Sequence, residues 1–318
     1  MPRRLLLVLA CLCALGLAAC GADGAAPTAA RPATTGAAAT PPARPAAAVT
    51  LAAAGDIACG PKERPSAIAC HQAQTAALLD RLRADVVLAL GDLQYPSGRL
   101  ADFRRMFGPT WGRWRARMRP VPGNHEFLQP GAAGYFLYFG ARAGPRGRGW
   151  FSYDVGGWHL VALNANCTKV GCATGSAQER WLRADLARHP RRCTLAYWHQ
   201  PRFSSGLHGN DSHLVPLWRD LRRAGAELVL SGHDHDYERF APQTESGRRD
   251  SARGVVQFVV GTGGENHYPI VRVRPNSLVH NSFTFGVLEL SLRPGSYDWR
   301  FHPEAGATFT DSGSARCH

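Results

Sequence analysis

Residues 85–95 read DVVLALGDLQY, an apolar run of strand length that ends in a glycine, an aspartate and, three residues later, a tyrosine. Three other runs have the same form: VTLAAAGD at 49–56, TLAYWH at 194–199 and ELVLSGHDH at 227–235. Short apolar runs bounded by glycine and polar residues are typical of buried strands. The sequence therefore predicts four strands whose ends carry Asp or His side chains.

Helical stretches separate these predicted strands, at residues 66–83, 176–188 and about 213–223. The second opens with Ser176 and Glu179, which have the spacing of a capping box. Alternating strands and helices indicate an α/β fold with buried sheets, in which ligands bind at the carboxyl ends of strands. Residues 254–301 hold strand-like runs without long helices, and we expect them to complete a second sheet.

The first 48 residues differ from the rest of the chain. Residues 1–19 have a basic start, a short apolar run and a small-residue end, as an export signal does. Their end, Leu17-Ala18-Ala19-Cys20, resembles the lipobox of bacterial lipoproteins, whose cysteine is acylated; an ordinary secretory signal is the alternative. Residues 20–48 are rich in Ala, Pro and Thr and predict a disordered linker. Residues 49–318 are then expected to form one domain.

The formal net charge of +13 comes mainly from arginines spread over the chain. No groove-reading motif or aromatic-interleaved basic strip accompanies them, so we expect no specific nucleic-acid binding. A positive field does favour anionic phosphate esters. Membrane contact is expected only through a lipid anchor on Cys20, at the extracellular face of the cell membrane; without that anchor the protein would be secreted.

Cysteine usage agrees with export. Apart from Cys11, Cys13 and Cys20 the chain has six cysteines: Cys59, Cys70, Cys167, Cys172, Cys193 and Cys317. An even number in an exported domain predicts disulfides, with fifteen connectivities allowed. Proximity favours Cys59 with Cys70 and Cys167 with Cys172, which leaves Cys193 to pair with Cys317.

The predicted strand ends, together with PGNHE at 122–126, gather metal-ligating side chains. Each segment alone is weak evidence, because a lone Gly-Asp is usually a turn and a lone His is usually structural. Two metal ions need a shared carboxylate between them, and Asp92 suits that role. Imidazole, carboxylate, amide and phenolate ligands suit Fe, Zn or Mn better than Ca or Mg. The candidate ligands are Asp56, Asp92, Tyr95, Asn124, His199, His233 and His235.

Taken together and in order, the five segments resemble the calcineurin-like metallophosphoesterase superfamily, and within it the purple acid phosphatases, over about residues 54–239. The motifs that carry the resemblance are Asp56-Ile57-Ala58, Gly91 to Tyr95, Gly123 to Glu126, His199 and Gly232 to Arg239. The resemblance implies an α/β fold of two mixed β-sheets packed as a sandwich and flanked by helices. It also implies a dinuclear metal site in the loops at the carboxyl ends of the strands.

Carried over residue by residue, the resemblance divides the ligands into two sets that share Asp92. Fe(III) would be bound by Asp56, Asp92, Tyr95 and His235. A second ion, Fe, Zn or Mn, would be bound by Asp92, Asn124, His199 and His233.

Ala58 and Tyr95 favour the purple acid phosphatases over other members of the superfamily. Many relatives, cyclic-nucleotide phosphodiesterases among them, place a metal-binding His where this chain has Ala58, and an alanine cannot bind metal. Tyr95 supplies the missing ligand, and a phenolate on ferric iron would colour the protein. The departure from the pattern is Ala58 itself, because the purple acid phosphatases have glycine there.

The resemblance further implies a hydrolase of phosphate monoesters that acts by attack of a metal-bound hydroxide, and the N-terminal signal implies that it is exported. His125 is the expected contact to the phosphate and an aid to proton transfer. His208 is the second candidate, with an exposed loop histidine as its alternative; His267 is a weaker one. Glu126 and Asp234 are expected to form hydrogen bonds rather than bind metal. A phosphodiesterase or nucleotidase of the same superfamily, and more distantly a catalytically silent surface lipoprotein that binds a ligand, are the rival functions.

Overall fold

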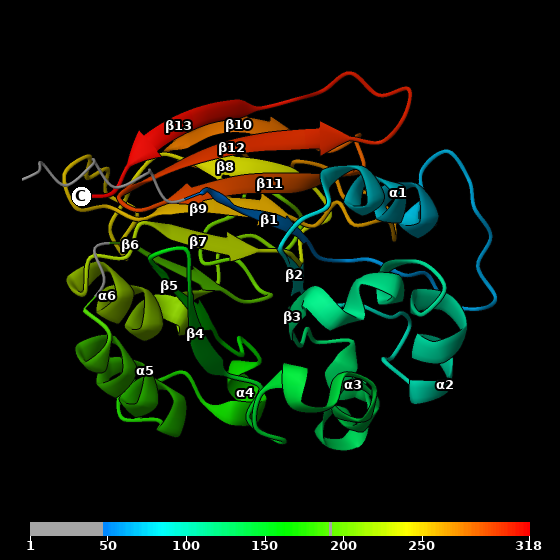
Figure 1. Cartoon of the computed structure of the whole chain (residues 1–318), viewed down its shortest axis with the longest axis horizontal. Helices are drawn as coiled ribbons and strands as arrows, with labels where there is room; N and C mark the ends of the chain where they lie inside the picture. The colour runs from blue at the N-terminus through cyan, green and yellow to red at the C-terminus, as the bar shows by residue number, and fades with distance from the viewer. Residues whose placement is uncertain (1–46, 191–192) are drawn as a thin grey trace, which may run out of the picture. The chain divides into compact units, whose positions relative to one another are not determined.

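The backbone of residues 47–190 and 193–318 is described by a computed structural model, shown in Figure 1. The expected export signal, Cys20 and all but the end of the expected linker lie outside the described residues, so those assignments stay predictions. No helix among the described residues is long and apolar enough to cross a membrane.

The first sheet contains the first two strands expected from the sequence. Its order is β13-β12-β11-β1-β2-β3, with β1 parallel to β2 and β2 parallel to β3. The strands on the other side of β1 are antiparallel to their neighbours. Their bounds are β1 Val49–Ala54, β2 Val86–Leu90, β3 Met118–Val121, β11 Gly286–Arg293, β12 Ser296–Pro303 and β13 Ser312–Arg316.

The second sheet contains the other two expected strands. Its order is β10-β8-β9-β7-β6-β5-β4, and the four strands β5, β6, β7 and β9 are parallel. Its strands are β4 Phe151–Val155, β5 Trp158–Ala162, β6 Cys193–Tyr197, β7 Leu228–Ser231, β8 Tyr237–Phe240, β9 Val256–Val260 and β10 Ser277–Asn281. All residues of β5, β6 and β7 are buried, as expected for parallel strands covered on both faces.

The expectation that residues 254–301 complete the second sheet is only half right. Strands β9 and β10 do lie in that sheet, but β11 and β12 belong to the first one, where β11 pairs with β1 from Leu288 opposite Ala53 to Leu292 opposite Val49. The apolar alternation of β11 indicates a strand without indicating which sheet it joins. This long-range antiparallel pairing makes the first sheet mixed. The second sheet is mixed because β4 is antiparallel to β5, and β8 is antiparallel to both β9 and β10.

The helices cover the outer faces of the sheets. They are α1 Gln72–Leu82, α2 Leu100–Asp102, α3 Ala133–Phe139, α4 Cys167–Val170, α5 Ala177–Arg188 and α6 Val215–Arg223. Helix α1 starts six residues later than 66, because Cys70 has a left-handed φ of 68° that a helix does not allow. Helix α5 begins as predicted, with the Ser176 side chain accepting a hydrogen bond from the Glu179 amide.

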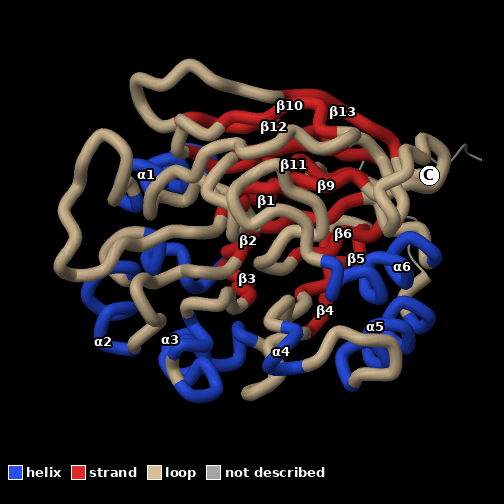
Figure 2. Tube along the Cα trace, turned by 180° about the vertical axis from the view of Figure 1, so that it is seen from behind, coloured by secondary structure: helices blue, strands red, loops and turns tan. Residues whose placement is uncertain are grey.

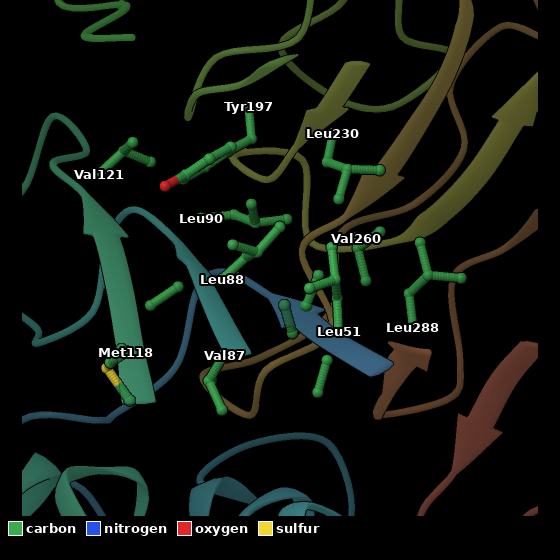
Figure 3. Close-up of a cluster of buried hydrophobic side chains, with 14 of the residues drawn as sticks. Leu51, Val87, Leu88, Leu90, Met118, Val121, Tyr197, Leu230, Val260 and Leu288 are labelled. Atoms are coloured by element: carbon green, nitrogen blue, oxygen red, sulfur yellow. The ribbon is translucent and has the colours of Figure 1, made fainter. Parts of the chain in front are cut away.

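Two apolar layers hold these elements together. Between the sheets lie side chains from both of them, including Leu51, Leu88 and Leu288 from the first and Leu230 and Val260 from the second (Figure 3). Burying each such side chain contributes roughly 1.5–3 kcal/mol. A separate layer, which includes Trp198, Trp218, Leu182 and Leu221, lies between the second sheet and helices α5 and α6. The two sheets are thereby fixed face to face, with their strand ends along a common edge.

All three expected disulfides are present: the two favoured by proximity in the sequence, Cys59–Cys70 and Cys167–Cys172, and the remaining pair, Cys193–Cys317. The third joins the start of β6 to the chain end across a sequence separation of 124 residues, whereas the second spans 5.

The disulfides are expected to differ in their effect on stability according to loop length. Replacing both Cys193 and Cys317 by Ala should lower the free energy of unfolding by roughly 5 kcal/mol, because a long loop is released in the unfolded chain. The same change at Cys167 and Cys172 should cost roughly 2 kcal/mol. Urea denaturation of the two double variants measures both values. Equal losses of unfolding free energy in the two double variants would contradict the expected dependence on loop length.

Candidate metal centre

The strand ends of both sheets meet at one edge, which brings the expected metal ligands together. Asp56 and Asp92 follow the parallel strands β1 and β2, while His199 and the His233–His235 segment follow the parallel strands β6 and β7. Backbone hydrogen bonds join the loops: Gly55 N donates to Val260 O at 2.9 Å and Gly232 N to His199 O at 2.9 Å.

The backbone is strained at three of these residues. Asp56, Asp92 and His233 have φ values of 59°, 48° and 74°, in the left-handed region that non-glycine residues seldom occupy. Hydrogen bonds hold these conformations, because Asp56 Oδ2 accepts from His233 N at 2.8 Å and Asp92 Oδ1 accepts from His125 N at 2.8 Å. Such strain is often found at functional sites.

Glycines give the ligand side chains room to approach. A Cβ on Gly91, whose φ is 86°, would lie 2.6 Å from the His199 ring. A Cβ on Gly123 would lie 2.1 Å from Asp92 Oδ1. Glycine at these two positions therefore leaves space that the Asp92 and His199 side chains occupy.

One end of the site is built around Tyr95. Its hydroxyl lies 3.0 Å from Asp56 Oδ1, 3.3 Å from Asp92 Oδ2 and 3.0 Å from His235 Nε2. A single phenol hydrogen cannot serve three acceptors at once. Ala58 is buried beside this group and contributes only a methyl group, and it is not among the described residues with positive φ.

The other end is built around His199. Its Nε2 lies 3.1 Å from Asp92 Oδ2 and 3.2 Å from His233 Nδ1. His199 and Asp92 are almost fully buried, at 0% and 2% side-chain exposure. Asp92 thus contacts both groups, as expected of a shared ligand.

Neighbouring groups hold the imidazoles with their free nitrogens toward the site. His199 Nδ1 donates to Leu90 O at 2.8 Å, which leaves Nε2 facing Asp92. The amide oxygen of Asn266 contacts His235 Nδ1, which leaves Nε2 facing Tyr95. Hydrogen bonds of this kind fix the tautomer of metal-binding histidines.

The acid–base balance shows how strongly the groups interact. Burial raises the pKa of Asp92, but His199, His125 and His233 outweigh it and bring the pKa below its usual value. Burial lowers the pKa of His199, yet Asp92 and Asp56 raise it to about 9. Burial, followed by the charges of Asp56 and Asp92, raises the pKa of Tyr95 well above 10.

These residues fit a pair of metal ions. Buried oxygen and nitrogen acceptors crowd together with too few hydrogens between them, which is unfavourable unless cations balance them. Donor atoms of Asp92, His199 and His233 all lie within 4.8 Å of one another. The donors are carboxylate, imidazole and phenol, a set that suits Fe, Zn or Mn.

Asn124 is the one expected ligand whose side chain is not seen against the other six. Its Oδ1 lies 3.5 Å from Gln200 Nε2. Its chain neighbours do reach the site. The Asp92 carboxylate occupies the space where a side chain at Gly123 would lie, and it accepts a hydrogen bond from the His125 amide. The His125 ring lies at the site edge, with Nδ1 at 2.6 Å from Pro96 O and Nε2 at 3.9 Å from Asp92 Oδ2.

A groove opens beside His233 and Asn124. It consists of two cavities of about 300 and 370 Å³ that share Gln200, Asp211 and His213 in their walls. Asn124 lines the first cavity, and His208 and His233 line the second. The His208 ring lies 4.1 Å from the His233 ring. His208 is exposed and lies in a loop, yet that loop places its ring beside His233.

Two acidic residues support the site through hydrogen bonds, as expected. Asp234 Oδ1 accepts from the amide and from Nδ1 of His208, at 2.8 and 3.0 Å. The buried Glu126 carboxylate accepts from the amides of Gly123 at 2.7 Å, Leu93 at 2.9 Å and Asp92 at 3.0 Å. Burial and then Asp92 raise the pKa of Glu126 to about 7, although the Gly123 and Leu93 amides and His199 oppose the rise.

The sequence reasoning overlooked two residues in the segment 263–268. Asn266 orients His235, and the Tyr268 ring stacks on His235 at 3.8 Å. His267, the residue that was singled out there, stacks on Phe285 at 3.8 Å and lines neither cavity of the groove. The sequence GGENHY at 263–268 indicated a loop with polar side chains near the site, but it did not indicate which of them turns toward it.

Comparisons with known proteins agree with this geometry. Residues 50–237 match the family model described as calcineurin-like phosphoesterase. Purple acid phosphatase 18 of Arabidopsis thaliana is 27% identical over 248 residues, which cover 70% of this chain and 54% of that protein. An uncharacterized protein of Mycobacterium tuberculosis is 30% identical over 237 residues, which cover 58% of this chain and 43% of that protein. The chain spans about half the length of these relatives.

Among solved structures, a purple acid phosphatase from yellow lupin seeds has a similar fold. The TM-score is 0.68 at 17% identity, over 85% of this chain and 54% of the lupin chain. At this identity the likeness concerns the fold, and it bears out the expected sandwich of two mixed sheets flanked by helices.

Replacing Glu126 by Gln is expected to loosen the centre without removing a ligand. An amide offers one acceptor oxygen where the carboxylate offers two, and its NH₂ would face backbone amides. The free energy of unfolding should fall by about 2 kcal/mol or more, as for buried donors left unpaired. Bound metal should also be lost more readily to a chelator. Urea denaturation and elemental analysis after dialysis measure the two effects, with Glu289→Gln on β11 as the control. If Glu126→Gln had the stability and the metal retention of the wild type, the hydrogen bonds that the Glu126 carboxylate accepts would be dispensable.

Proposed function

The chain belongs to the calcineurin-like phosphoesterase family, and from that premise we propose that it is an exported phosphatase that hydrolyses phosphate monoesters at a dinuclear metal site of the purple acid phosphatase type. The chain is a metallophosphoesterase related to purple acid phosphatases. The ester class, the metals and the export are the parts that we propose.

The position of the Tyr95 hydroxyl carries the proposal. It lies among Asp56, Asp92 and His235, at 3.0 to 3.3 Å from each, while Ala58 offers no ligand atom. Without a cation, burial and the two carboxylates keep the phenol protonated. A ferric ion would offset those charges and stabilise the phenolate. This supports Fe(III) bound by Asp56, Asp92, Tyr95 and His235.

The second ion, Fe, Zn or Mn, would be bound by Asp92, Asn124, His199 and His233. When bound, the two ions lower the pKa of water and offset the charge on the phosphoryl oxygens. The groove lies on the side of Asn124 and His233, so the ester would enter there.

Two histidines, His125 at the edge of the site and His208 in the wall of the groove, would bind the phosphate and supply the proton. The Nδ1 atoms of His125 and His208 are engaged with Pro96 O and Asp234 Oδ1, which leaves each Nε2 free for substrate. In hydrolysis the water oxygen forms a bond to phosphorus and the bond from phosphorus to the alcohol oxygen breaks. We assign the phosphate contact to His125. We assign the protonation of the leaving oxygen to His208.

Export is supported by the three disulfides, which persist in oxidising compartments. The lipid anchor on Cys20 rests on the sequence motif alone. With the anchor, the domain would work at the extracellular face of the membrane; without it, the protein would be secreted.

The iron-bound protein is expected to be coloured because of Tyr95. Tyr95→Phe should remove the visible absorption band, since no phenolate remains to transfer charge to ferric iron. Tyr153→Phe, which changes a tyrosine on β4, is the control and should keep the band. Absorption spectra of the three proteins at equal iron content make the comparison. A band that survives in Tyr95→Phe would refute the assignment of Tyr95.

The substrate class can be tested with Asp92 as the reference residue. Loaded with iron and zinc, the wild type should hydrolyse p-nitrophenyl phosphate with a higher kcat/KM than bis-p-nitrophenyl phosphate or nucleotides. Asp92→Asn should lower turnover by about a thousandfold or more, because both ions lose a shared ligand. A preference for the diester or for nucleotides would favour a phosphodiesterase or nucleotidase. No turnover of any ester by the metal-loaded wild type would favour the silent ligand-binding protein.

A further inference from the structure

Lys169 is an exposed residue in the wall of the groove, and no step of the proposed hydrolysis uses its positive charge. It lines the same cavity as Asn124. Its ammonium group has no hydrogen bond or ion pair to any residue in the described part of the chain. Lys169 and Lys62 are the only lysines in a sequence whose other cationic side chains are arginine. A strongly hydrated, unpaired ammonium beside a phosphate site is suited to bind a second anion.

The segment that carries Lys169 is fixed relative to the metal centre. It belongs to α4, which lies between α3 and α5 in both views (Figures 1 and 2). The Cys167–Cys172 disulfide closes the loop, with 5.0 Å between the two Cα atoms. The Asn166 side chain then ties the loop to the Asn124 segment by donating to Pro122 O at 3.2 Å and Gly123 O at 3.3 Å. Lys169 therefore presents its charge from a rigid base.

A second observation concerns Gln200, which lines both cavities of the groove. Its Nε2 faces Asn124 Oδ1 and Asn166 Oδ1, each at 3.5 Å. Its Oε1 is buried and accepts no hydrogen bond within residues 47–190 and 193–318. Buried polar atoms are usually paired, so this oxygen is suited to accept a hydrogen bond from a substrate hydroxyl.

Asp211 is the acidic residue in the groove wall that would oppose an anion. Its Oδ1 accepts from the amide and from Nδ1 of His213, both at 2.8 Å. The carboxylate is therefore engaged with the imidazole. Among the described residues that line the first cavity, Lys169 is the lysine or arginine without an ion-pair partner.

We propose that the groove binds phosphate monoesters of polyhydroxy alcohols that carry a second anionic group, and that Lys169 binds that group. The reacting phosphate would lie at the metal centre, a hydroxyl would donate to Gln200 Oε1, and the second phosphate or carboxylate would lie against Lys169. This inference rests on the proposed phosphatase function and specifies its substrate class.

Two matched pairs of esters test the proposal. Glucose 1-phosphate and glucose 1,6-bisphosphate differ by a phosphate, and glycerol 3-phosphate and 3-phosphoglycerate differ by a carboxylate. The wild type should prefer the more anionic member of at least one pair, and the pair concerned identifies the anion. Lys169→Glu should reduce that preference roughly tenfold, mainly through KM, as expected when a hydrogen bond to a charged group distant from the reacting atoms is lost.

Lys62→Glu makes the same change of charge at a residue that lines neither cavity, and it should leave the preference unchanged. Added salt should weaken the wild-type preference, because the groove is open to solvent. Equal preference in the wild type and Lys169→Glu, or an equal loss in Lys62→Glu, would overturn the role of Lys169. Turnover of glucose 1-phosphate by the metal-loaded wild type is judged separately, because its absence would refute the phosphatase function itself.

Discussion

The crowding of Asp56, Asp92, Tyr95 and the site histidines is the constraint on which the rest of the structure depends. Two buried carboxylates, a phenol and imidazole nitrogens lie within hydrogen-bond distance of one another, with fewer hydrogens than acceptors. Burial lowers the pKa of His199, but Asp92 and Asp56 raise it to about 9, because a proton on this imidazole offsets part of the carboxylate charge. Metal cations would offset the same charge. Metal binding would release that proton and make every acceptor a ligand.

The fold keeps this arrangement in place through backbone geometry and clamping groups. Asp56, Asp92 and His233 keep left-handed backbones because the loops that follow the strands are hydrogen-bonded to one another. Glu126 gathers the amides of the Asp92 and Gly123 segments around one carboxylate. The apolar layer between the sheets, part of which is drawn in Figure 3, fixes the strand ends from which the expected ligands extend. Chemistry at the site thus depends on packing remote from it.

Sequence reasoning predicted the features that follow from local pattern. The four strands, helix α5 with its Ser176 cap and the two short disulfides could be predicted because apolar runs, caps and close cysteine spacing are local signals. The Cys193–Cys317 disulfide followed only because these were the two cysteines left. Three other features could not be predicted: the sheet that β11 joins, the late start of α1 and the side chain that orients His235. They depend on long-range pairing, on the left-handed φ of Cys70 and on which residue of a loop faces inward.

The central claim is that seven residues bind two metal ions that share Asp92. Anomalous scattering from crystals of the metal-loaded protein, measured at the iron and zinc absorption edges, tests it most directly. The account predicts two peaks about 3.5 to 4 Å apart with Asp92 between them, the iron peak beside Tyr95 and the other beside Asn124. A single peak, or two peaks with no contact to Asp92, would contradict it.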